Sequence, residues 1–179
     1  GAAYDEVPGK EAVHTHAGLC RETPGLDLVA AADPDPRRRD AMRGFWAVPR
    51  VYDGHRELLE AETLDAVLVA VPDGVHAPIL RDVLSIRPPR LVFAEKPLAP
   101  TTAESREIAS AYAARGVPLL VDHVRRFDAA HRAAREMIRS GRLGRIECAM
   151  GVYVRGLRHN GCQMLNLMRF FLGEISTVR

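Results

Sequence analysis

Residues 65–97 read DAVLVAVPDGVHAPILRDVLSIRPPRLVFAEKP, and this stretch decides the fold class. It opens with the apolar run Asp65–Val71 and closes with a second apolar run, Leu91–Ala94. Between them, the apolar residues of Val75–Ile86 recur at helical spacing. Short continuous apolar runs are typical of strands that are buried on both faces of a parallel sheet. The stretch therefore predicts a strand, a crossover helix and a second parallel strand.

The same alternation extends in both directions along the chain. Upstream, Leu26–Ala32 predicts a strand and Arg37–Phe45 a helix. Downstream, Thr101 and Glu104 form a capping box that begins a further helix, and Val117–Val121 predicts another strand. Apolar strands that alternate with amphipathic helices indicate an α/β fold. We predict a Rossmann-type, doubly wound parallel sheet, with a first strand expected upstream of Gly1.

The pattern changes after residue 121. Asp128–Ser140 predicts a helix, Ile146–Val154 a strand, and the spacing from Met164 to Phe171 a second helix. One strand and two helices bury little apolar surface by themselves. We therefore expect two parts: a dinucleotide-binding Rossmann domain over residues 1–121 and a partial α+β substrate or oligomerisation domain over residues 122–179.

Composition excludes several classes of protein. The 179 residues carry 25 Lys and Arg against 23 Asp and Glu, for a formal net charge of +2. This balance gives no reason to expect nucleic-acid binding. No apolar run approaches the roughly 20 residues of a membrane-spanning helix, and no secretory signal opens the sequence, so no membrane partner is expected.

The cysteines are odd in number and isolated from one another: Cys20, Cys148 and Cys162. Free thiols in a reducing compartment fit this pattern, which predicts a cytoplasmic location. A thiol nucleophile at Cys162 remains an alternative, because His159 is nearby in sequence. His14 and His16 lack a third ligand at short spacing, so no metal site is expected.

Polar residues follow directly after the predicted strands. They are Asp33, Pro72 and Asp73, Glu95 to Pro97, and Asp122 with His123. Ligands of open parallel sheets bind beyond the carboxyl ends of the strands, so these positions are candidates for a binding site. A carboxylate at Asp33 can accept hydrogen bonds from a ribose and favours NAD, whereas Arg37 and Arg38 could hold the 2′-phosphate of NADP instead.

Several segments now carry a family resemblance. The segments are residues 65–76, 94–99 with Glu95-Lys96-Pro97, 121–127 with Arg125-Arg126-Phe127, 140–146 and 159–174. In this order they resemble the Gfo/Idh/MocA oxidoreductases. The resemblance implies binding of NAD, with NADP as the alternative, and hydride transfer to or from a sugar-like or polyol secondary alcohol or ketone. It also implies a small-molecule sugar or polyol substrate and pairing of copies into a homo-oligomer.

The resemblance assigns candidate residues to each task. The expected cofactor-binding residues are Gly1, Ala3, His16, Asp33, Arg38, Val71, Pro72, Asp73, His76, Glu95 and Lys96. The expected catalytic residues are Lys96, His159 and Gln163, and the expected substrate-binding residues are Lys96, Arg126, His159 and Gln163.

The chain departs from the family at its acid/base position. Where the family has Asp-x-x-x-His and then a second Asp, this chain has His159, Gln163 and Asn166. A glutamine amide exchanges no proton near neutral pH, but an imidazole does, so His159 or Lys96 could take the proton role. The alternative is a catalytically degraded dinucleotide-binding or assembly protein of the same fold.

Overall fold

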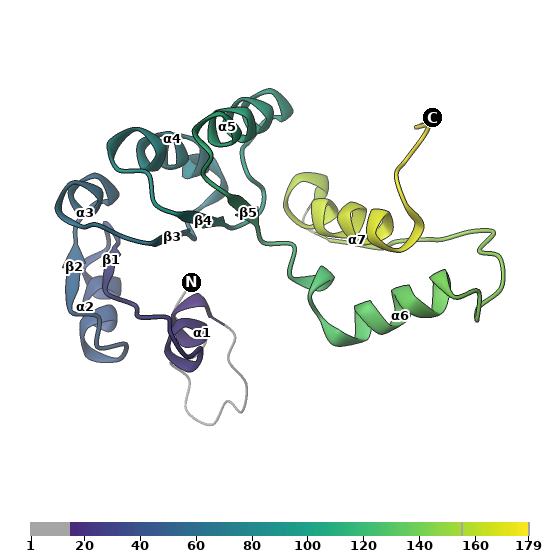
Figure 1. Cartoon of the computed structure of the whole chain (residues 1–179), viewed down its shortest axis with the longest axis horizontal. Helices are drawn as coiled ribbons and strands as arrows, with labels where there is room; N and C mark the ends of the chain where they lie inside the picture. Colours follow the sequence, from purple (N-terminus) through teal and green to yellow (C-terminus); the bar gives the residue numbers. More distant parts are fainter. Residues whose placement is uncertain (1–14, 155, 179) are drawn as a thin grey trace.

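The computed structural model describes residues 15–154 and 156–178 (Figure 1). The expected cofactor-binding residues Gly1 and Ala3, and also His14, lie outside this part of the chain. We call residues 15–121 the N-terminal lobe and the described residues from 122 onward the C-terminal lobe. Figure 1 shows the two lobes side by side, with α6 and α7 in the second.

Five short strands run parallel to their neighbours in the N-terminal lobe. β1 (Ala30–Ala32) pairs with β2 (Arg50–Tyr52) in one sheet. β3 (Ala66–Val69), β4 (Leu91–Ala94) and β5 (Leu119–Val121) form a second sheet in that order. The parallel pairing and the alternation with helices confirm the predicted Rossmann-type α/β class, although the described strands form two sheets instead of one.

The α-helices described in this lobe are α1 (His16–Glu22), α2 (Pro36–Gly44), α3 (His55–Ala61), α4 (His76–Ile86) and α5 (Thr102–Arg115). Three of these five, α1, α2 and α5, begin at a residue whose side chain caps the helix. The Thr101 side chain accepts a hydrogen bond from the backbone N–H of Glu104 at 3.2 Å, as the capping box predicts. Gly116 ends α5 at φ 66°, a left-handed conformation that glycine adopts without steric cost.

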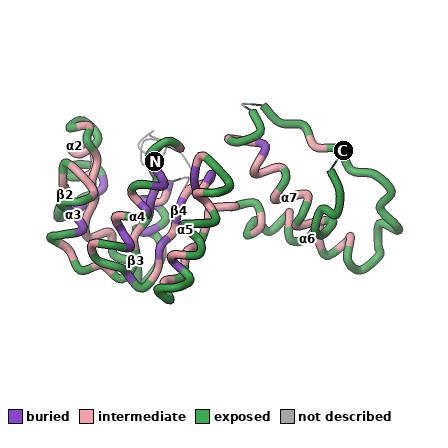
Figure 2. Tube along the Cα trace, turned by 90° about the horizontal axis from the view of Figure 1, so that it is seen from above, coloured by how far each residue is buried: buried purple, intermediate pink, exposed green. Residues whose placement is uncertain are grey.

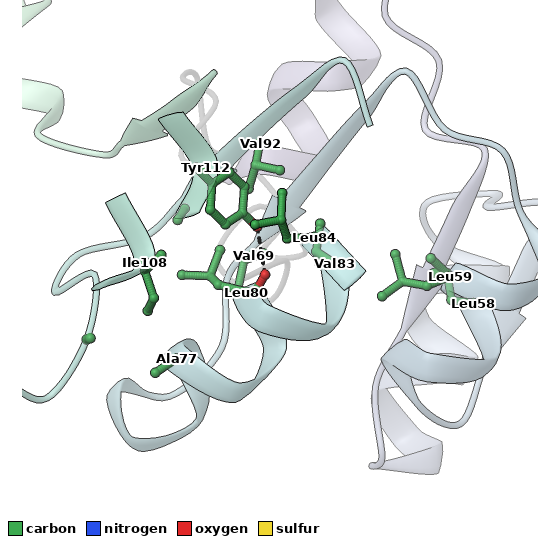
Figure 3. Packing of buried hydrophobic residues seen from close by; sticks show 12 residues of the cluster. Leu58, Leu59, Val69, Ala77, Leu80, Val83, Leu84, Val92, Ile108 and Tyr112 are labelled. Atoms are coloured by element: carbon green, nitrogen blue, oxygen red, sulfur yellow. Dashed lines mark hydrogen bonds between the residues drawn. The ribbon is translucent and has the colours of Figure 1, made fainter. Parts of the chain in front are cut away.

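The hydrophobic core lies between α4, α5 and the β3–β4–β5 sheet (Figure 3). Leu80, Val92 and Ile108 are at most 1% exposed there. Tyr112 is equally buried, and its hydroxyl donates to the backbone oxygen of Leu80 at 2.8 Å. Burial of each such side chain contributes roughly 1.5–3 kcal/mol, so this core holds the strand ends of the sheet in place.

The C-terminal lobe is much less buried (Figure 2). It contains η2 (Val124–Arg126), α6 (Ala129–Arg139), the π-helical turn η3 (Leu157–Gly161) and α7 (Cys162–Leu172). The two α-helices meet through ring contacts: His131 stacks on Phe171 at 6.2 Å between centroids, and the Arg135 guanidinium lies 4.5 Å from the centre of the Phe170 ring. Neither helix buries a residue fully.

The predicted strand over Ile146–Val154 is wrong. The chain is irregular there, and Met150 and Val152 are 88% and 79% exposed. A strand needs a neighbour to satisfy its backbone hydrogen bonds, and no strand lies beside this segment in the described part of the chain. The sequence pattern also failed to indicate β2 and α3, which follow the first strand and its helix.

None of the helices in the described ranges is both long and apolar enough to cross a membrane.

Candidate functional site

The carboxyl ends of the strands bring together residues that are far apart in sequence. Asp73 begins η1 (Asp73–Val75) shortly after β3, Glu95 and Lys96 follow β4, and Asp122 follows β5. Because β3, β4 and β5 are neighbours, these side chains share one edge of the sheet. The same edge faces the C-terminal lobe: the His159 backbone oxygen of η3 accepts a hydrogen bond from Lys96, and the His159 ring contacts Asp73.

Lys96 connects the two lobes. Its Nζ donates a hydrogen bond to the backbone oxygen of His159 at 3.0 Å. Its backbone N–H donates to the Glu95 carboxylate at 3.3 Å, and the Lys96–Pro97 peptide bond is cis. The ammonium therefore lies at the junction of the lobes.

His159 lies beside Asp73 at the same junction. Its Nδ1 is 3.1 Å from the Asp73 Oδ2, and the two side chains are 43% and 37% exposed. Cys162 donates its Sγ–H to the His159 backbone oxygen at 3.3 Å. Burial raises the pKa of the Cys162 thiol, which favours the protonated form and not a thiolate nucleophile.

Gln163 is held at both ends of its amide. Its Oε1 accepts from His123 Nδ1 at 3.3 Å, and its Nε2 donates to the backbone oxygen of Asp122 at 3.2 Å. Nearby, Arg126 Nε donates to Asn166 Oδ1 at 2.6 Å. The two candidate substrate residues Gln163 and Arg126 thus join α7 to the segment that follows β5.

His16, Glu95 and Asp122 form a further cluster. Their potential ligand atoms all lie within 4.8 Å of one another, and His16 Nε2 is 3.1 Å from Glu95 Oε1. The hydrogen bond to His16 lowers the pKa of Glu95, whereas burial raises the pKa of Asp122. One imidazole and two carboxylates have the chemistry to hold a divalent cation. Sequence spacing did not reveal this cluster, because it depends on His16, the first residue of α1, lying beside Phe93 of β4 with ring centroids 5.5 Å apart.

Asp33 lies directly after β1 and is fixed by two donors. Its Oδ1 accepts from the backbone N–H of Asp35 at 2.9 Å, and its Oδ2 is 3.4 Å from Arg38 Nη1. The carboxylate is 25% exposed and the Arg38 side chain 68%. A partly exposed carboxylate at this strand end fits the adenosine ribose of NAD. Arg38, the residue that could hold a 2′-phosphate, pairs with the Asp33 carboxylate instead.

His76 is placed differently from the other candidates. Its ring is completely buried at the start of α4, and Nε2 lies 2.7 Å from the backbone oxygen of Val71. Nδ1 has no hydrogen-bond partner among the described residues. The side chain therefore supports the turn through Val71 and Pro72, and it is shielded from any ligand beyond the sheet.

A cavity of about 240 Å³ has Gln163 in its lining. Its lining includes Arg125, Tyr153, Asn160, Gln163 and Met164. Arginine and amide side chains provide the donors and acceptors that a polyhydroxylated ligand requires. Asn160 and Tyr153 were absent from the sequence-based candidates, because they lie outside the strand ends and were assigned no role by the motifs.

Parallel strands, crossover helices and polar groups at the carboxyl edge define a nucleotide-binding α/β protein of the Rossmann class. A comparison with family models then gives the particular family. The Gfo/Idh/MocA model, described as "Oxidoreductase family, NAD-binding Rossmann fold", matches residues 9–123. The chain belongs to this family.

Relatives of known name agree with this assignment. An inositol 2-dehydrogenase of Rubrobacter xylanophilus is 35% identical over 122 residues, which are 68% of this chain and 34% of that protein. An inositol 2-dehydrogenase of Burkholderia multivorans is 31% identical over 169 residues, which are 87% of this chain and 50% of that protein. The chain thus spans between a third and half of the length of these relatives.

Solved structures share the fold. The myo-inositol 2-dehydrogenase of Lactobacillus plantarum superposes with a TM-score of 0.77 at 21% identity, covering 88% of this chain and 52% of that one. The scyllo-inositol dehydrogenase of Lactobacillus casei, solved with NAD(H) and scyllo-inositol, gives 0.75 at 20% identity, covering 88% and 52%. At these identities the likeness establishes the fold alone.

Proposed function

We propose that this chain contributes the cofactor-binding part and one side of the substrate site of an NAD-dependent oxidoreductase that acts on a cyclic polyol such as inositol. The observation that carries the proposal is the Lys96 ammonium, placed after β4 and hydrogen-bonded across the lobe junction to His159. The names of the relatives support inositol as the first substrate to test.

The proposed cofactor is NAD. The Asp33 carboxylate would accept hydrogen bonds from the adenosine ribose, and its negative charge would repel a 2′-phosphate. Pairing of Arg38 with Asp33 supports this preference, because the guanidinium is then partly neutralised. Bound nicotinamide would supply the hydride acceptor for alcohol oxidation.

The chain's own residues would handle the proton. During oxidation of a secondary alcohol, the C–H hydrogen leaves as hydride to the nicotinamide and the O–H hydrogen leaves as a proton. Lys96 would stabilise the negative charge that develops on the oxygen, and His159 would accept the proton. Gln163 and Arg126 would line the substrate side, with Gln163 at the wall of the 240 Å³ cavity.

Calorimetric titration with NADH and NADPH, followed by an assay of NADH formation with myo-inositol and scyllo-inositol, tests the proposal. We expect tighter binding of NADH and measurable turnover of one inositol. Lys96→Met should lower turnover by about 10²- to 10⁴-fold, because a positioned proton-handling group is lost. Arg90→Met is the control, since Arg90 is a surface residue paired with Asp65. Binding of NADH without turnover by the chain would favour the degraded binding protein instead.

A further inference from the structure

Asp73 and His159 make a contact that the family resemblance does not assign. They lie 86 residues apart in sequence and on different lobes, with the His159 Nδ1 at 3.1 Å from the Asp73 Oδ2. An ionised carboxylate can only accept hydrogen bonds. In the neutral imidazole, the proton must therefore lie on Nδ1, and Nε2 carries the free lone pair.

We infer that Asp73 is a positioning residue that holds His159 in the Nδ1–H tautomer and so keeps Nε2 ready to accept the proton of a substrate hydroxyl. In that step the substrate O–H bond breaks, a bond from Nε2 to hydrogen forms, and the hydride from the same carbon goes to the nicotinamide. The substrate part of this inference rests on the proposed function. The tautomer is a property of the chain alone.

The surroundings of His159 distinguish this pair from an ordinary surface ion pair. Its backbone oxygen accepts hydrogen bonds from both Lys96 Nζ, at 3.0 Å, and Cys162 Sγ, at 3.3 Å. The residue also lies in the π-helical turn η3, and such turns are frequent at functional sites. Lys96 and Cys162 thus hold the backbone of His159, and Asp73 holds its ring. The His159 side chain is still 43% exposed, so a ligand can reach it.

Nitrogen-15 NMR of the histidine rings tests the tautomer directly. In mildly alkaline buffer, where imidazoles are neutral, we expect His159 to be Nδ1–H, with its signals assigned by their loss in His159→Asn. Asp73→Asn should shift His159 toward Nε2–H, because the amide can donate to Nδ1. Asp73→Glu should restore Nδ1–H. Asp82→Asn is the matched control: Asp82 pairs with His55 Nε2 at 2.7 Å, so this variant should leave His159 unchanged.

Activity provides a second, separate readout. Asp73→Asn should lower inositol turnover by about 10²-fold or more, with Asp73→Glu recovering part of it. The inference would be overturned if His159 is Nε2–H in the parent chain, or if its ring nitrogen signals are unchanged in Asp73→Asn. Either result would count against it even if the chain oxidises inositol. The expected tautomer shift in a chain without turnover would instead support the positioning role and contradict the proposed function.

Discussion

At the scale of single residues, Asp33 is the position that should decide between the two cofactors. We expect Asp33→Asn to narrow the preference for NADH over NADPH by about tenfold, which corresponds to about 1.4 kcal/mol, because the repulsion of the 2′-phosphate is removed and Arg38 is released. Calorimetric titration of both cofactors measures the ratio. Asp40→Asn is the matched control, because it removes a carboxylate from α2 that pairs with Arg43 and not with Arg38. If both variants show the same ratio of NADH to NADPH affinity, Asp33 does not select the cofactor.

One rule of sheet geometry predicts which residues lie together at the carboxyl edge of the sheet. Asp73, Lys96 and Asp122 follow different strands, and parallel strands place their carboxyl ends at one edge. The rule could not pair Asp73 with His159 or His123 with Gln163. Those partners are 86 and 40 residues apart; the first contact depends on how the lobes dock, and the second on how α7 packs against the segment that follows β5. That arrangement is a tertiary property that no local spacing encodes.

At the scale of elements, the Tyr112 hydroxyl joins α5 to α4 inside the core. Burial raises the pKa of Tyr112 well above its ordinary value, so the hydroxyl remains a donor to the Leu80 oxygen throughout the usual pH range. We expect Tyr112→Phe to lower the free energy of unfolding by about 1 kcal/mol. Urea denaturation measures it. Tyr153→Phe is the control, because Tyr153 is 42% exposed and its loss of a hydroxyl should change the free energy of unfolding little. An equal loss of stability in Tyr153→Phe would argue against the Tyr112 hydrogen bond as the cause.

The ends of α5 could be predicted closely because their causes are local. The capping box at Thr101 and the left-handed Gly116 fix both ends of α5 within a few residues. The apolar run at 146–154 has the composition of a strand but lacks a neighbouring strand within residues 15–154 and 156–178. A strand needs a neighbouring strand for its backbone hydrogen bonds, so the apolar composition of 146–154 was not sufficient to predict one.

At the scale of the whole molecule, the described lobes meet largely through polar side chains. Lys96 donates a hydrogen bond to the His159 backbone oxygen, and the Asp73 carboxylate contacts the His159 ring. Next to this junction, at the start of the C-terminal lobe, His123 adds a titratable group that contacts Gln163 of α7. The strength of docking between the lobes should therefore depend on pH more than the apolar core of the N-terminal lobe does.

Burial lowers the pKa of His123 below its ordinary value of 6.5. Between the lowered value and the unfolded value, the unfolded chain binds more protons, so His123 contributes stability at neutral pH that is lost as pH falls through this window. We expect His123→Gln to flatten the fall in the free energy of unfolding between about pH 7.5 and about pH 5.5. Urea denaturation at the two pH values measures the free energy of unfolding, and His131→Gln on α6 is the control variant. An equally steep fall in His123→Gln would show that other groups govern the acid sensitivity of the molecule.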